Sequence, residues 1–239
     1  VYVNSPAFDR RASQYVNREI ARRTGAEVIL GDFDWSFWQR RFRLNDLTLR
    51  GLEPPEEAPL AHFGRIDIGL NFRTLFQRKI DLFELTLTRP EFHVLFGSDG
   101  KTNVPSPETA DGPKLDFEIS IENFNIVDGS ALVNERKVHI DFSLRNISAL
   151  LNYRGSRQVL ESHLSFDGVF DRHASGKPSI PYSLSADMDY TRATLMAHRI
   201  TIRAGRTEVK LQGRINDLNK NIAGKLEYTG NVHTPFLNY

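Results

Sequence analysis

The sequence predicts a mainly β protein, with one long, curved antiparallel sheet that folds into an open groove and is capped by one N-terminal amphipathic α-helix. Three observations predict this fold. Apolar and polar residues alternate with the two-residue period of a strand over much of the chain, as at Ile66, Ile68, Leu70 and Phe72. A three-residue step between apolar positions recurs along the chain. After Gly25 no stretch has a helical pattern.

The three-residue step is an internal repeat beside alternating strands. It occurs at Leu44 to Leu47, Leu82 to Leu85, Ile121 to Phe124, Leu144 to Ile147, and Ile215 to Leu218. A strand that keeps one face inward must bulge at such a step, and bulges at matching positions bend neighbouring strands along a shared crease. Without helices to cover it, an apolar sheet face needs another partner, and the step favours a trough over a sandwich. The alternative is an interior filled by its own side chains.

The first element expected is a helix over residues 5–25. Ser5 can cap it, Pro6 suits its first position, and Gly25 can close it. An apolar stripe of Phe8, Ala12, Val16 and Ile20 runs along it among several arginines. Such a helix either caps the end of the sheet, which we favour, or rests on anionic lipid headgroups; the two roles are compatible.

The rest of the chain, 26–239, is expected to form a single domain of strand repeats. Its first hairpin turns around Trp35–Trp38, whose aromatic side chains either plug a core or sit at a membrane interface. Loops rich in Pro, Gly, Ser or charge are expected at 52–59, 104–113 and 171–181. A further turn is expected at 128–130 (Asp-Gly-Ser), between two antiparallel neighbours.

The strongest alternating strands supply the candidate residues for lining the groove. They are Ile66, Ile68, Leu70, Phe72, Phe92, Val94, Phe96, Phe117, Ile119, Ile121, Val138, Ile140, Phe142 and Leu144.

Composition and motifs give no sign of catalysis, of a cofactor or of a metal. The net charge is +1, which argues against nucleic acid as a partner, and the absence of cysteine excludes thiolate chemistry. The segment 97–102 (GSDGKT) lacks the first glycine of a phosphate-binding loop and is expected to be a turn. Asp187 and Asp189 share a strand face, which is far more often solvated than a cation site. The histidines show no ligand spacing. We therefore expect a protein that is not an enzyme.

The order of segments resembles the N-terminal periplasmic region of the AsmA/TamB superfamily of bacterial envelope proteins, TamB-like members most of all. The resemblance rests on an alternating strand, a basic loop, a strand with Thr-Arg-Pro at 88–90, and Asp-Gly-Lys-Thr-Asn-Val-Pro at 99–105. Two later segments fit as well: FEISIENFNIVDGSALV (117–133) and ITIRAGRTEVKLQGRINDLNKNIAGKLEY (200–228). The resemblance implies a repeating β-groove.

The same resemblance implies a function and a location. It implies that the groove carries phospholipid acyl chains between the inner and outer membranes, in the periplasm of a Gram-negative bacterium. The chain would then be a fragment of a longer protein, held to the inner membrane by an anchor upstream of Val1. The alternatives are an outer-membrane assembly module whose strand edges pair with a barrel partner, and an envelope scaffold.

Overall fold

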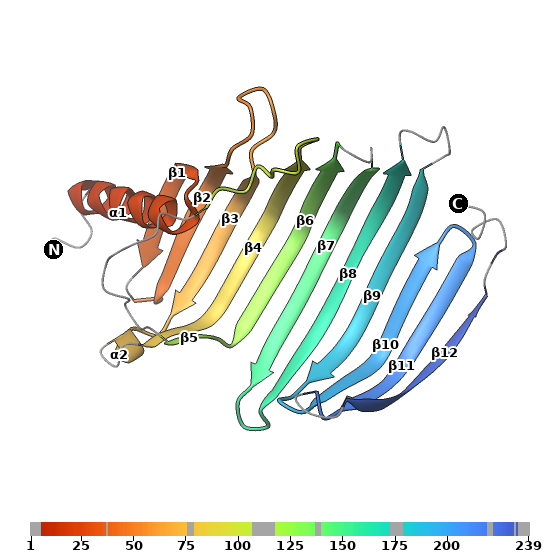
Figure 1. Cartoon of the computed structure of the whole chain (residues 1–239). Coiled ribbons are helices and arrows are strands. Elements are labelled where there is room, and N and C mark those ends of the chain that lie inside the picture. The colour runs from red at the N-terminus through yellow and green to blue at the C-terminus, as the bar shows by residue number, and fades with distance from the viewer. Residues whose placement is uncertain are drawn as a thin grey trace.

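The computed structural model describes residues 6–36, 38–75, 79–106, 118–136, 140–172, 179–218, 222–231 and 233, apart from the side chains of 6–13, 16, 75, 118, 119 and 172. Its elements (Figure 1) are α1 Pro6–Thr24, β1 Glu27–Ser36, β2 Arg41–Arg50, β3 Ala61–Leu70, α2 Phe72–Leu75, β4 Lys79–Phe96, β5 Glu118–Ile121, β6 Asn123–Glu135, β7 Ile140–Arg154, β8 Val159–Arg172, β9 Ile180–Tyr190, β10 Thr194–Ala204, β11 Thr207–Asn216 and β12 Ala223–Asn231.

The described strands form one open sheet of 12 strands, so the mainly β class is confirmed. Their order is β1-β2-β3-β4-β6-β7-β8-β9-β10-β11-β12, with β5 paired to the start of β4. β1 and β12 form opposite edges and do not meet, which leaves the sheet unclosed. The sheet twists along this order, and Figure 1 shows β12 nearly edge-on at the end opposite α1.

The expectation of an antiparallel sheet throughout is wrong at one place. β6 runs parallel to β4, with Leu85 opposite Phe124 and Phe92 opposite Ala131, and β5 is parallel to β4 as well. A parallel neighbour requires a return connection of a dozen residues or more. The segment 97–117 is long enough for that return, which the predicted turn at 97–102 and loop at 104–113 did not indicate.

The N-terminal helix begins at Pro6 and ends at Thr24, one residue inside the expected 5–25 at each end; Ser5 lies outside the described residues. Gly25 follows with φ 72, and its N–H donates to the Ala21 carbonyl at 2.8 Å, a typical glycine termination. α1 packs against β1. No helix within the described ranges is long and apolar enough to cross a bilayer.

A second, short helix contradicts the expectation of no helix after Gly25. β3 stops at Leu70, and Phe72 begins α2 rather than continuing the strand. The Asn71 carbonyl accepts hydrogen bonds from both the N–H and the hydroxyl of Thr74, at 3.2 and 2.8 Å, and these bonds close a helical turn. Apolar alternation continues to Phe72, which is why the sequence pattern overran the strand end.

A row of irregular backbone positions crosses six neighbouring strands, which we call the crease row. It consists of Gly31 on β1, Asp46 on β2, Gly64 on β3, Arg89 on β4, Asp128 on β6 and Asn146 on β7. The four non-glycine members have φ between 49 and 56°, a left-handed backbone that costs of the order of 1 kcal/mol or more at each such residue. Apolar positions step by three across each member, so each strand bends there.

Asp128 belongs to this row, so the expected turn at 128–130 is wrong. β6 runs through Asp128 and Gly129 to Glu135, because the three-residue step from Ile126 to Gly129 matches the steps on β4 and β7. Two of the five predicted steps, at Leu44 and Leu144, belong to the crease row. The steps at Leu82 on β4 and at Ile121 before β6 lie side by side, outside the crease row. The step that begins at Ile215 lies at the end of β11.

The polar face of the sheet carries the loop 51–60 and the turn after β4. Asn103 is 4% exposed; its side-chain oxygen accepts the Leu95 N–H at 2.9 Å and its amide donates to the His93 carbonyl at 2.8 Å. Glu53 accepts from Asn103 and from the Gly51 and Leu60 N–H groups. The Asp-Gly-Lys-Thr-Asn segment thus ties two loops to the polar face, and residues 107–113 of the expected loop 104–113 lie outside the described part.

The third expected loop, 171–181, is shorter than predicted, because β8 runs to Arg172 and β9 begins at Ile180.

Candidate functional site

One face of the sheet is apolar from the first strand to the last. The clearest row of paired residues crosses every strand of the main path: Trp35, Phe42, Ile68, Leu85, Phe124, Leu151, Ser162, Met188, Ala197, Gly213 and Leu226. Ser162 is its single hydroxyl, and that hydroxyl donates to the Met188 carbonyl at 2.9 Å. We call the whole surface the apolar face.

The apolar face is well buried at the end near α1. Leu44, Leu47 and Ile66 form its buried cluster, and Ile20 of α1 packs against that cluster beside side chains of β1 to β4. α1 therefore lies over this end of the face, and burial there is what a small hydrophobic core requires.

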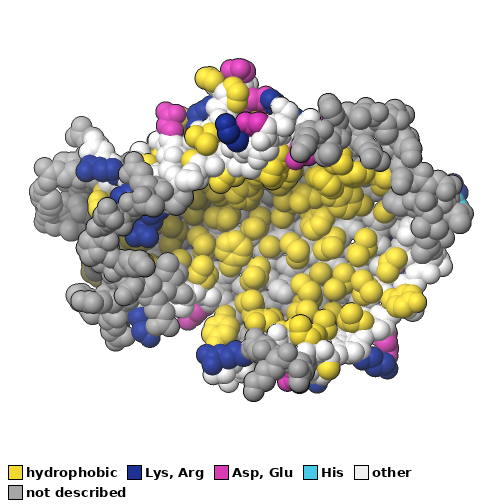
Figure 2. Space-filling view, in the orientation of Figure 1, with side chains coloured by type: hydrophobic (Ala, Val, Ile, Leu, Met, Phe, Trp, Pro, Cys, Tyr) yellow, Lys and Arg dark blue, Asp and Glu magenta, His cyan; other side chains and the backbone are white. Residues whose placement is uncertain are grey.

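Burial falls away from the second half of β4 onward, where the apolar face has no second layer in the part of the chain that the structure describes. Apart from neighbouring strands, the substantial contacts between described elements are those of α1 with β1 and of α2 with β4. Phe92 is 38% exposed, Phe142 42% and Leu226 54%. Figure 2 looks onto this face and shows hydrophobic side chains across its breadth, with charged side chains at its border. Such a wide exposed apolar surface is typical of a binding site rather than of an ordinary solvent-facing surface.

The register places most of the predicted lining residues on the apolar face. On β3 these are Ile66, Ile68 and Leu70; on β4, Phe92, Val94 and Phe96; on β5, Ile121; on β7, Ile140, Phe142 and Leu144. Ring contacts join them to neighbours, with Phe63–Phe92 centroids at 5.6 Å and Phe142–Phe170 centroids at 5.0 Å.

Four predicted lining residues stand apart. Phe72 lies on α2, and its ring packs edge-on against Phe42 at 5.9 Å, so it borders the face rather than extending a strand across it. Ile119 is on β5 opposite Ile80, but its side chain lies outside the described residues. Phe117 and Val138 lie outside the described residues altogether.

None of the predicted lining residues lies on β8, β9 or β10, although these strands contribute to the apolar face. These strands bring Leu164, Phe166, Phe170, Leu184, Met188, Ile200 and Ile202 to the same face. Their alternation was visible, but serines, histidines and alanines reduce its amplitude, so no residue there was selected.

Gly168 and Tyr182 fit together closely within the face. A Cβ at Gly168 would stand 2.3 Å from Cζ of Tyr182, because the tyrosine ring occupies the space where a side chain of β8 would be. The Phe166 ring meets that of Tyr182 edge-on at 6.2 Å. Burial raises the pKa of the Tyr182 hydroxyl.

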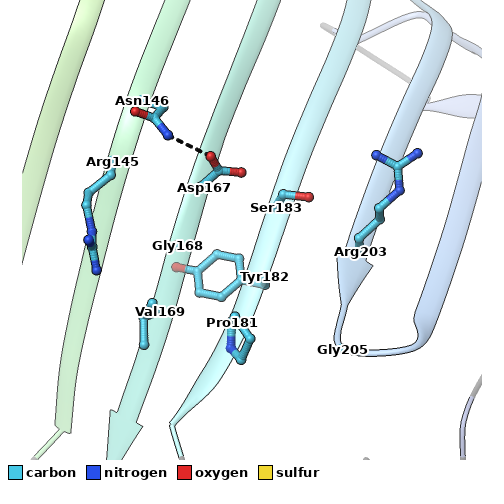
Figure 3. Close-up of a pocket in the computed structure, with 10 residues that line it drawn as sticks. All are labelled: Arg145, Asn146, Asp167, Gly168, Val169, Pro181, Tyr182, Ser183, Arg203 and Gly205. Carbon is cyan, nitrogen blue, oxygen red and sulfur yellow. Dashed lines mark hydrogen bonds between the residues drawn. The ribbon is translucent and has the colours of Figure 1, made fainter.

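The polar side of the same strands carries an open pocket of about 480 Å³, drawn in Figure 3. Arg145, Asp167, Ser183 and Arg203 stand opposite one another on β7 to β10, and the Asn146 amide donates to Asp167 at 2.8 Å. Arg203 also pairs with Glu208 at 2.6 Å. The hydrogen bond to Asp167 and the ion pair of Arg203 both lie along the solvated face.

Asp187 and Asp189 lie on that polar face too, and each meets a histidine. Asp187 is 2.6 Å from His163 Nδ1, and Asp189 is 2.8 Å from His198 Nε2. Over the described residues, no group of three or more His, Asp or Glu side chains is placed to hold a metal ion. The two pairs are separate His–Asp contacts across neighbouring strands.

Comparison with known proteins identifies no relative of this chain. No protein-family model matches the chain, and no curated protein matches it.

Proposed function

We propose that this protein is a non-enzymatic lipid carrier whose apolar face forms a groove for phospholipid acyl chains. The observation that carries the proposal is the row of apolar residues that crosses all strands of the main path without an unsatisfied polar side chain. A continuous apolar track suits a hydrocarbon chain that slides, because no position along it demands a polar partner.

The energetics favour transfer along such a groove. Burying a sixteen-carbon chain is worth on the order of 12 kcal/mol relative to water, at about 0.8 kcal/mol per methylene. Burial of the same chain in a bilayer is worth about the same free energy, so acyl tails exchange between membrane and groove with little net change in free energy. The groove's effect is kinetic, since it removes the water-exposed intermediate. At about 4.8 Å per strand the main path covers roughly 48 Å.

The crease row supports the groove shape. Its members occupy matching positions on six strands, so each strand bends about one line and the apolar face becomes the inner side of the bend. The contact of Ile20 with the buried cluster supports α1 as the cap of the groove's first end. A phospholipid would keep its headgroup in water at the open side.

The resemblance to the AsmA/TamB superfamily supports the same function and sets its place. We propose a periplasmic location, an inner-membrane anchor preceding Val1, and phospholipid movement between the two membranes of a Gram-negative envelope.

A second candidate function is protein assembly through strand pairing. β12 pairs with β11 along nine residues, and its other edge meets no strand in the described part of the chain, while every residue of β12 is exposed. An open edge of this kind can accept a strand of a client or of an outer-membrane barrel. An envelope scaffold, by contrast, needs neither lipid nor client.

Three measurements separate these functions. Mass spectrometry of the purified protein should find copurified phospholipid, and the protein should accelerate transfer of a fluorescent phospholipid between two vesicle populations. A photo-crosslinker at Thr229 on the edge of β12 should give few protein adducts. Protein adducts without lipid would favour assembly, and neither adducts nor lipid would favour a scaffold.

A further inference from the structure

One corner of the molecule combines an exposed aromatic side chain with basic residues. It is built from the turn after β1, with Trp38 and Arg40, from Arg41 at the start of β2, and from α2 with Arg73; Figure 1 shows α2 at this corner, below α1. The Leu70 N–H donates to the Arg40 carbonyl at 2.9 Å, which holds the turn beside the residues that lead into α2. We call these four residues the Trp38 corner.

Trp38 is 91% exposed, the largest exposed fraction among the exposed large hydrophobic side chains. An indole combines a broad apolar ring with one N–H donor, so it is well suited to the boundary between headgroups and hydrocarbon. Trp35 on the same hairpin instead stacks on Phe42, with ring centroids 6.3 Å apart, within the apolar face. The two tryptophans of the chain therefore lie in different surroundings: Trp35 within the apolar face and Trp38 at the exposed corner.

The charge of the Trp38 corner is positive. The guanidinium carbons of Arg40 and Arg41 lie 5.3 and 5.7 Å from the centroid of the Phe83 ring, and Arg41 also pairs with Glu84 at 2.6 Å. Asp81, which lies beside Asn71 at the start of α2, accepts hydrogen bonds from the side chains of Asn71 and Ser120.

Arg40 and Arg73 have no acidic partner among the described residues, and both side chains are exposed. Two guanidinium groups without an acidic partner in the described part of the chain share this corner with an exposed indole, and together they are complementary to a surface that offers phosphates above hydrocarbon. An acidic protein surface would match the arginines but would leave the indole unmatched.

We propose that the Trp38 corner docks onto the surface of an anionic lipid bilayer, with Trp38 inserted at the headgroup level and Arg40 and Arg73 bound to lipid phosphates. The inference rests on the corner alone and does not need the proposed acyl-chain cargo. If both hold, docking brings the bilayer next to Phe42 and Phe72, where the apolar face begins.

Vesicle binding by the full chain tests this proposal. We expect sedimentation with vesicles containing about 30% phosphatidylglycerol, little with pure phosphatidylcholine, and loss of binding as salt rises. Each basic residue near such a surface contributes about fivefold in affinity, so the double variant R40Q/R73Q should bind roughly 25-fold more weakly. R157Q/R206Q is the matched control, because it removes two exposed arginines from turns at other strand ends.

Tryptophan fluorescence locates the contact. W35F leaves Trp38 alone, whose emission should shift to the blue on vesicle binding and be quenched by lipids brominated near the headgroup. W38F leaves Trp35, which should respond little, and should bind about tenfold more weakly. The proposal is overturned by absent vesicle binding, by equal losses in R157Q/R206Q, by an unshifted Trp38, or by a Trp38-dependent protein partner without vesicle binding.

Discussion

Replacing Phe142 by aspartate places a charge in the middle of the apolar face. The Phe142 ring packs against Phe170 at 5.0 Å and stands opposite Val133 on β6, yet it remains 42% exposed. Folding therefore buries about 120 Å² of a side chain that offers roughly 200 Å², which is worth about 3 kcal/mol. F142A and F142D should each lower the free energy of unfolding by about this amount, because without lipid the new carboxylate stays hydrated.

The two variants should differ in lipid binding. An acyl chain that covers the aspartate must displace its water, at a cost of at least about 3 kcal/mol, whereas a chain over alanine meets no charge. Lipid occupancy, measured by mass spectrometry after loading with a labelled phospholipid, should fall about 100-fold further in F142D than in F142A.

The control is Leu150 on the same strand, which is 44% exposed on the opposite face. L150D introduces the same charge with similar exposure and should leave lipid occupancy unchanged. Circular dichroism would first show that all three variants are folded. Full lipid occupancy in folded F142D, or an equal loss in L150D, would refute the reasoning that the apolar face holds the tails.

Three further predictions concern particular side chains. G168A should lower the free energy of unfolding by about 1–3 kcal/mol in urea titrations, because the Tyr182 ring occupies that space, whereas G155A, whose Cβ would lie 3.8 Å from its nearest neighbour, should not; equal effects would contradict the fit. The pKa of Tyr182 is raised from 10.0, so its contribution to stability should be present below about pH 10 and lost as pH rises through the folded pKa. The pKa of Tyr182, measured from the difference in absorbance between the protein and Y182F, should rise further when lipid is bound. A lower pKa with lipid would mean that lipid lies elsewhere. N103A should cost about 2–4 kcal/mol through the unpaired Leu95 N–H and His93 carbonyl, with lipid occupancy unchanged; a loss of lipid in folded protein would link the polar face to binding.

Sequence alternation was sufficient to predict the strands and their inward positions, because the two-residue period directly assigns residues to faces. Ile66, Phe92 and Phe142 could each be placed without knowledge of their partners. The three-residue step at Leu44 and at Leu144 also indicated where strands bend.

What the sequence left unpredicted depends on partners far along the chain. Asp128–Gly129 has the composition of a turn, and only the matching bends on β4 and β7 keep it within a strand. Arg89 adopts a left-handed backbone that arginine rarely prefers, so nothing local marks it. The parallel pairing of β4 with β6 follows from the length of the returning segment rather than from the strands.

The hydrogen bonds of Asn103 could not be predicted from the sequence either. Its partners at Glu53, His93 and Leu95 lie up to 50 residues away, and the local sequence shows only a turn. The Trp38 side chain illustrates the same limit, since the sequence favoured a packed core over an interfacial position for the aromatic cluster, whereas Trp38 is exposed.

Photo-crosslinking with a phospholipid that carries a diazirine near the end of one acyl chain tests the central claim most directly. After irradiation, peptide mapping by mass spectrometry should place the adducts on inward residues such as Phe124, Leu164 and Ile200, and spread them over several strands. Adducts confined to the polar face, or no adducts with a bound lipid present, would contradict the account.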